Sequence, residues 1–227
     1  MKYSIHKRGE IAMKNILKIM LMMITIFTIA GSAVYAAEIP VSDQDQLITS
    51  RDWTEISNLQ DEMKKEEPDA TIDYDKALKV YVDCNLIKLQ TADTKKLTSA
   101  LESANYVWVI PFKMEKTYGM FTVAKGLPLS EEAKSVLTKA EQEEVKNHAG
   151  KWMITETAEH TVEPYYDILL EKREALSDCT RVVLVGSQPG MRQPVALGMD
   201  DETARIWISL GYQYPVMEKI PETQNVE

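Results

Sequence analysis

The spacing of hydrophobic residues along the chain changes between a period of two and a period of about 3.6. Residues 78–84 and 205–210 alternate between apolar and polar positions, which is typical of half-buried β-strands. Residues 106–112 and 181–185 are apolar at nearly every position, as in strands near the centre of a sheet. With three further runs, these patterns predict strands at 78–84, 106–112, 118–124, 151–155, 181–185, 195–199 and 205–210.

Four other segments have the spacing of amphipathic helices, with apolar residues three and four positions apart. Each begins at a residue that caps or starts a helix: Ser50 or Asp52, Asp93, Ser130 and Pro164. The predicted helices are 52–67, 93–104, 130–147 and 164–176.

Helices interleaved with hairpins predict an α+β fold, a two-layer arrangement of packed helices and a largely antiparallel sheet. Two parts of the chain share the order strand, helix, strand, strand, which allows two β-α-β-β units. We therefore predict a polar tether at 37–50, one α+β domain at 51–215 with possible halves at 71–126 and 150–211, and a polar tail at 216–227.

The first 36 residues have the three parts of a secretory signal peptide. A basic N-terminus is followed by an uncharged stretch from Ile19 to Ala37, and small residues precede a cleavage site near Ala36–Ala37. Translation starts at Met1 or at Met13 on this pattern. We expect a cleaved, secreted, extracellular protein. The alternative is an uncleaved N-terminal helix that anchors the chain, because a bilayer span needs about 20 apolar residues.

Removal of residues 1–36 takes away five basic residues and one acidic residue, so the net charge changes from −9 to −13. An acidic chain of this kind argues against nucleic-acid partners, because phosphate binding needs clustered Lys and Arg. The sequence also lacks the spacings typical of metal sites and of phosphate-binding glycine loops. We expect no cofactor, no metal, and no membrane contact except through an uncleaved signal segment.

Cys84 and Cys179 are the two cysteines of the chain. In an oxidising compartment such a pair is a candidate disulfide. The alternative is two buried reduced thiols, since cysteine is among the most buried residue types.

Two features carry the candidate chemistry. Aromatic residues gather on the predicted hairpin and form a candidate binding face, although filling the core is their commoner role: Tyr106, Trp108, Phe112, Tyr118 and Phe121. Adjacent carboxylates occur at Asp73 with Asp75 and at Asp200 to Glu202, where a hydrolase could use an acid–base pair and where solvated turns are the alternative.

The sequence contains no recognisable catalytic motif. This favours a non-catalytic domain that binds a protein, a peptide or an envelope component outside the cell membrane. A secreted hydrolase with a carboxylate-based site is the alternative.

Overall fold

The computed structural model describes residues 39–84, 89, 91–160, 163–186, 193–210 and 217–219, all within the unit Glu38–Glu227. The predicted export signal, its cleavage site and its two possible start methionines lie outside these residues. None of the helices in the described part of the chain is long and apolar enough to cross a membrane.

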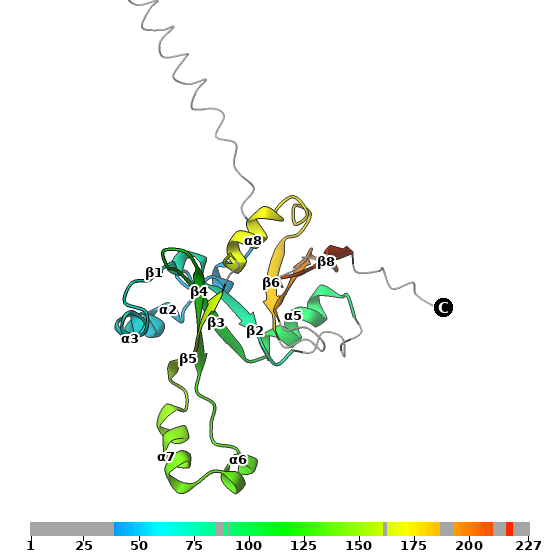
Figure 1. Cartoon of the computed structure of the whole chain (residues 1–227). Helices are drawn as coiled ribbons and strands as arrows, with labels where there is room; N and C mark the ends of the chain where they lie inside the picture. The colour runs from blue at the N-terminus through cyan, green and yellow to red at the C-terminus, as the bar shows by residue number, and fades with distance from the viewer. Residues whose placement is uncertain are drawn as a thin grey trace, which may run out of the picture. The chain divides into compact units, whose positions relative to one another are not determined.

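One mixed sheet organises the described residues, in the order β5-β4-β3-β2-β6-β7-β8-β9, with the short β1 paired to β3 (Figure 1). All neighbouring strands are antiparallel except β2 and β6, which are parallel. The strands are β1 (Thr71–Ile72), β2 (Leu78–Tyr81), β3 (Tyr106–Lys113), β4 (Tyr118–Lys125), β5 (Trp152–His160), β6 (Arg181–Val185), β7 (Val195–Met199), β8 (Ala204–Ser209) and β9 (Met217–Lys219).

Short helices connect these strands. They are the 3₁₀ turns η1 (Asp43–Asp45), η2 (Ser57–Leu59) and η3 (Tyr74–Lys76), and the α-helices α2 (Trp53–Ile56), α3 (Gln60–Glu66), α5 (Thr94–Glu102), α6 (Glu131–Val136), α7 (Lys139–His148) and α8 (Tyr165–Glu171). The α+β class with a mostly antiparallel sheet is thus confirmed. As predicted, the Asp93 side chain caps α5 by accepting from the backbone N–H of Lys96.

Helices lie against both faces of the sheet, because successive residues of a strand point to opposite faces. In β2, Leu78 and Val80 pack in a core cluster with Leu169 of α8. On the opposite face, Trp108 of β3 packs in a second cluster with residues of α2 and α3. A third cluster, beneath Leu97 of α5, covers the β6 and β7 side of that same face. The helices are therefore distributed over two faces rather than gathered in one layer.

The two parts that share the order strand, helix, strand, strand differ in how their strands pair. In the first, β2 lies beside β3, and α5 connects them. In the second, β5 pairs with β4 and β6 pairs with β2. The strands β2, β3 and β4 therefore lie between β5 and β6. The chain order is the same in both parts, but the second does not repeat the pairing of the first.

Both predicted terminal segments need correction. Residues 39–50 are not a tether: Ile39, Val41 and Leu47 are buried, and the N–H of Leu47 donates to the carbonyl of Ala77 at 3.1 Å. Three apolar residues among polar ones were enough to fix this segment against the sheet. The predicted polar tail contributes β9, which pairs with β8, while 220–227 lie outside the described residues.

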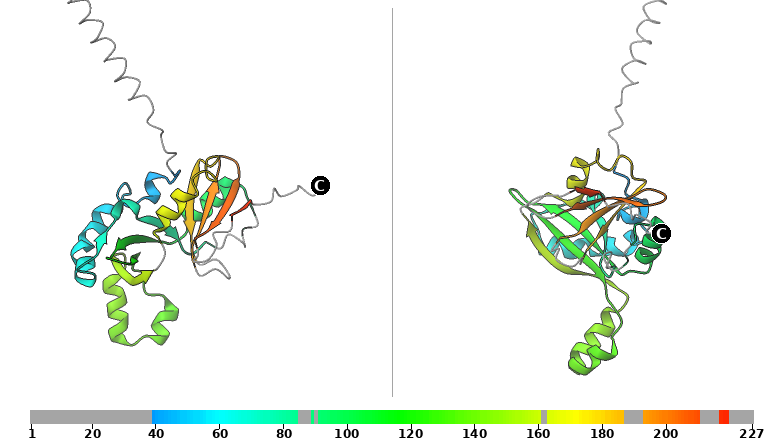
Figure 2. Two further views of the ribbon diagram at one scale, coloured as in Figure 1. Left: turned by 45° about the horizontal axis from the view of Figure 1, so that its top comes forward. Right: turned by 90° about the vertical axis from the view of Figure 1, so that its right-hand side faces the viewer.

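The helix predicted at 130–147 is two helices that project from the sheet between β4 and β5 (Figures 1 and 2). The break follows from Thr138, which forms a capping box with Glu141 and starts α7. The apolar residues of this segment, spaced as in an amphipathic helix, do not pack into a core. Neither α6 nor α7 contains a buried residue, and Val136 is 80% exposed. We call residues 127–150 the helical arm.

Candidate functional site

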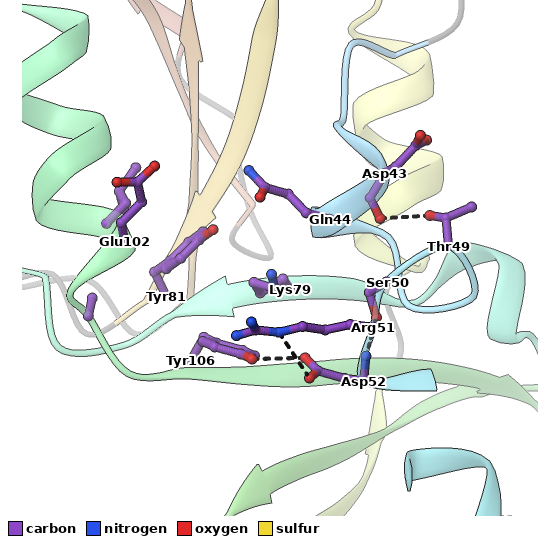
Figure 3. A pocket seen from close by; sticks show the side chains of 12 residues that line it. Asp43, Gln44, Thr49, Ser50, Arg51, Asp52, Lys79, Tyr81, Glu102 and Tyr106 are labelled. Carbon is purple, nitrogen blue, oxygen red and sulfur yellow. Dashed lines mark hydrogen bonds and ion pairs between the residues drawn. The ribbon is translucent and has the colours of Figure 1, made fainter. Parts of the chain in front are cut away.

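A pocket of about 410 Å³ opens on the sheet face that carries α2, α3 and α5, above β2 and β3 (Figure 3). It lies where the cluster beneath α2 and α3 gives way to the cluster beneath α5. Its walls are Asp43, Gln44, Thr49, Ser50, Arg51, Asp52, Lys79, Tyr81, Leu101, Glu102, Ala104 and Tyr106. We call it the Lys79 pocket.

Strand alternation places Lys79 in this pocket. Its neighbours Leu78 and Val80 point into the core beneath α8, so Lys79 must point to the opposite face. There it lies across from Trp108 on β3. Because β2 is a central strand, this lysine is buried, with only 9% of its surface exposed.

Aromatic rings surround the Lys79 ammonium group. The Nζ atom lies 4.6 Å from the ring centre of Tyr106, 5.2 Å from that of Trp108 and 5.8 Å from that of Tyr81. Rings at these distances attract a cation through their negative faces. Burial nevertheless lowers the pKa of Lys79 from its ordinary value, and the negative charge of Asp45 opposes that change.

The hydrogen-bond donors of Lys79 are poorly used. Its nearest anion is Asp45, whose Oδ1 lies 3.6 Å from Nζ, too far for a good hydrogen bond. Among the described residues no shorter polar contact to Nζ is found. An ammonium group has three donors. In the described residues the fully buried side-chain nitrogens without a partner are Trp152 Nε1 and Arg181 Nε, and Lys79 Nζ is not one of them, so its donors are open to the pocket. The pocket is the place from which acceptors can reach them.

Asp45 is held by several donors at once. Its Oδ1 accepts from the Tyr81 hydroxyl at 2.8 Å, and its Oδ2 accepts from Ser42 at 2.6 Å and from Arg181 Nη2 at 3.0 Å. Only 2% of Asp45 is exposed. Burial, together with the Asp45 charge, raises the pKa of Tyr81, so this tyrosine stays a donor. Asp45 thus fixes the N-terminal segment to β2 and β6.

Asp52 plays the same part at the other side of the pocket. Its Oδ2 accepts from the Tyr106 hydroxyl at 2.8 Å and from Trp108 Nε1 at 3.1 Å. Burial and this bond raise the pKa of Tyr106. Arg51 Nε lies 3.9 Å from Asp52 Oδ1, and the arginine side chain extends along the pocket beside Tyr106 (Figure 3). Because 89% of the Arg51 side chain is exposed, it can adjust to a ligand at the rim.

The predicted aromatic face is not one surface. Trp108, Phe112 and Phe121 are buried in the cluster beneath α2 and α3, with at most 1% exposed. Tyr118 pairs with Lys113 and lines a small pocket with Tyr165 on the face of α8. Of the five residues, only Tyr106 lines the Lys79 pocket. Trp108, Phe112 and Phe121 point to the same face as Tyr106 but are covered by α2 and α3, and Tyr118 points to the other face.

The carboxylates considered for a hydrolase lie apart. Asp73 forms an ion pair with Lys76 at 3.6 Å beside β3. Asp200 closes the turn between β7 and β8 by accepting from two backbone N–H groups, which lower its pKa to about 2. Asp75, Asp201 and Glu202 are exposed. Among the described residues, no group of three or more His, Cys, Asp or Glu side chains could hold a metal ion.

The structure agrees with the alternative of two buried thiols and not with the candidate disulfide. Cys84 and Cys179 are both buried, and no bond joins them. Cys179 packs beneath α8, whereas Cys84 packs in the cluster beneath α5, so the two thiols lie on opposite faces of the sheet. Burial raises the pKa of both thiols, which lowers their reactivity.

Sequence reasoning did not find Lys79, Asp45 or Asp52 as site residues. Lys79 fitted the polar positions of a half-buried strand, Asp45 lay in the supposed tether, and Asp52 fitted a helix cap. The sequence did contain one signal, the alternation of Lys79 with apolar residues. Such a lysine is buried when its strand lies at the centre of the sheet and aromatic side chains from the same and the neighbouring strand cover it. The central position of β2, between β3 and β6, is what buries Lys79.

No protein-family model matches the chain, and no curated protein or solved structure matches it either. The assignment of function therefore depends on the site itself.

Proposed function

We propose that the chain is an exported, non-catalytic binding protein whose ligand occupies the Lys79 pocket. The observation that carries the proposal is a mostly buried lysine at the wall of a pocket of about 410 Å³, whose ammonium group has its nearest described acceptor, Asp45 Oδ1, only at 3.6 Å. This volume lies in the range of small-ligand sites, about 300–1,000 Å³. Convergent polar groups on a rigid sheet fix the orientation of a ligand without any loop closure.

Binding is favoured over hydrolysis because the two buried carboxylates are already engaged. Asp45 accepts from three donors, and Asp52 Oδ2 accepts from two. A general base must be within hydrogen-bond reach of the proton that it removes. Either carboxylate would have to break a buried hydrogen bond before it could act, so we assign both a structural role.

The place of action follows from the proposed signal peptide at residues 1–36. Outside the membrane, the ligand would be a peptide, another protein's exposed group or an envelope component. The net charge of −13 expected after cleavage supports the exclusion of nucleic acid as a partner.

The test combines ligand screening with activity assays on the purified chain. Peptides, sugars and small acids are screened by thermal shift, and the hits are repeated with Lys79→Met. We expect saturable stabilisation that the variant loses, and no turnover of ester, glycoside or peptide substrates. Turnover that disappears in Asp52→Asn would instead establish a hydrolase and refute the proposal.

A further inference from the structure

We propose that the ligand of the Lys79 pocket is an organic carboxylate, and that the apolar group attached to it lies in a second pocket on the other side of Tyr106. This inference rests on the proposed function, because it names the ligand of that same pocket.

The lining of the pocket contains two cations, Lys79 and Arg51, and three acids, Asp43, Asp52 and Glu102. Lys79, Arg181 and Arg51 are cationic, while Asp45 and Asp52 are the anions that contact them. Arg181 is paired with Asp45 at 3.0 Å, and Arg51 is the neighbour of Asp52. The Lys79–Asp45 contact, at 3.6 Å, is longer than the hydrogen bonds that Asp45 accepts, so the Lys79 ammonium can take a further acceptor from a ligand. A singly charged anion meets less repulsion from the three lining acids than a dianion would.

A carboxylate also matches the geometry of the two cations. Its oxygens accept charge-assisted hydrogen bonds, which are shorter and stronger than neutral ones. One oxygen would meet Lys79 Nζ in the pocket, and the other would face Arg51, whose exposed side chain extends toward Tyr106 (Figure 3). The remaining acids of the lining, Asp43 and Glu102, are exposed to solvent and therefore repel the anion only weakly.

A second pocket, also about 410 Å³, shares the wall residues Ala104 and Tyr106 with the first. It lies at the base of the helical arm and is largely apolar, with Leu127, Pro128 and Trp152 in its lining. Leu127 is 60% exposed, so a ligand there would remove apolar surface from water. We call it the arm-base pocket.

Tyr106 connects the two pockets. Its ring centre lies 5.8 Å from that of Trp152, which lines the arm-base pocket, and 4.6 Å from Nζ of Lys79, which lines the Lys79 pocket. A ligand with an acid at one end and a ring or short alkyl chain at the other can lie across Tyr106 and use both pockets. The polar Lys79 pocket and the apolar arm-base pocket thus select an amphipathic acid.

Three probes separate the two halves of the proposal by isothermal titration calorimetry on the full chain. Acetate carries the acid alone, 3-phenylpropionate carries acid and ring, and methyl 3-phenylpropionate carries the ring without charge. Lys79→Met removes the cation and keeps an unbranched side chain that is one atom shorter. Arg51→Gln removes the second cation of the pocket. Because the Arg51 side chain is 89% exposed, this change should not disturb the fold.

We expect 3-phenylpropionate to bind at least about tenfold more tightly than acetate or the ester, and more weakly as salt is added. Lys79→Met should weaken it by about tenfold or more, the loss expected for a charged hydrogen bond, and Arg51→Gln by severalfold. Leu127→Ser should weaken 3-phenylpropionate and leave acetate unchanged. Val136→Ser, an equally conservative change on the arm outside both pockets, is the control and should alter neither.

Equal binding of ester and acid would overturn the carboxylate assignment while leaving a ligand site at Lys79. Equal effects of Leu127→Ser and Val136→Ser would overturn the role of the arm-base pocket. If none of the three probes binds at millimolar concentration, the inference fails. The proposed function would still be tested by its own screen, where binding of a neutral ligand lost in Lys79→Met would keep it.

Discussion

Replacing Asp45 by alanine removes the carboxylate that joins the N-terminal segment to the central strands. Asp45 has 3% of its side chain exposed, and its partners Lys79 and Arg181 have 10% and 17% exposed. The substitution leaves two buried cations, Lys79 and Arg181, without their counter-ion and the Tyr81 hydroxyl without its acceptor. Loss of one partner from a buried ion pair typically costs about 3–5 kcal/mol, and we expect Asp45→Ala to lower the free energy of unfolding by that amount.

Two variants make the comparison specific. Lys79→Met leaves Asp45 paired with Arg181 and bonded to Tyr81, so the free energy of unfolding should change by no more than about 1 kcal/mol. Asp45→Ala combined with Lys79→Met should be more stable than Asp45→Ala alone, because the unpaired lysine is gone. Asp43→Ala, an exposed acid in the same turn, is the control and should stay within about 0.5 kcal/mol of the parent.

The assay is urea unfolding followed by tryptophan fluorescence, which the buried Trp108 and Trp152 report from the core. A loss below about 1 kcal/mol in Asp45→Ala would refute the reasoning, because a buried ion pair would then contribute little. Equal losses in Asp45→Ala and Asp43→Ala would show that position 45 is not special.

Other predictions concern the sheet, the thiols and the N-terminus. Gly198→Ala should destabilise the fold by about 1–3 kcal/mol in the same urea assay, since a Cβ there would lie 2.7 Å from Cys179 Sγ; an unchanged midpoint would show that the sheet relaxes. Asp200 has its pKa lowered from 3.8 to about 2, so its contribution to stability is complete above pH 3.8 and is lost as the pH falls toward 2. The difference in melting temperature between the parent and Asp200→Ala should therefore narrow as the pH falls from 4 to 2, and a constant difference over this range would contradict the prediction. Mass spectrometry after alkylation should find Cys84 and Cys179 unreacted in the folded protein and both modified in urea; a linked pair would contradict the fold. N-terminal sequencing of the extracellular product should start near Ala37, and a product that starts at residue 1 or 13 would contradict cleavage.

The regular parts of the fold could be predicted because period and capping are local properties. Strands β3, β4, β6 and β7 lie within one residue of the positions expected, and Asp93 and Ser130 cap the helices predicted for them. The helix predicted at 130–147 failed where two local signals competed. Thr138 with Glu141 was a second helix start within one hydrophobic pattern, and the capping box decided the outcome.

The site could not be predicted in the same way, because its parts come together only through the order of the strands. The parallel pairing of β2 with β6 brings Arg181 close to Asp45, 136 residues earlier in the chain. Nothing local in the sequence indicates that pairing. Likewise, Tyr106 remained at a pocket while Trp108, two residues later on the same face, became buried, since α2 and α3 cover one position and not the other.

The most direct test of the binding site is the titration of Lys79 by NMR, using ¹³C-labelled lysine and assigning the signal by its loss in Lys79→Met. Without ligand, the pKa of Lys79 should lie below its ordinary value of 10.5, because burial disfavours the charge. Saturating 3-phenylpropionate should raise that pKa, since a bound carboxylate stabilises the ammonium form. A Lys79 signal that titrates at 10.5 and does not respond to the carboxylate would contradict the site at its centre.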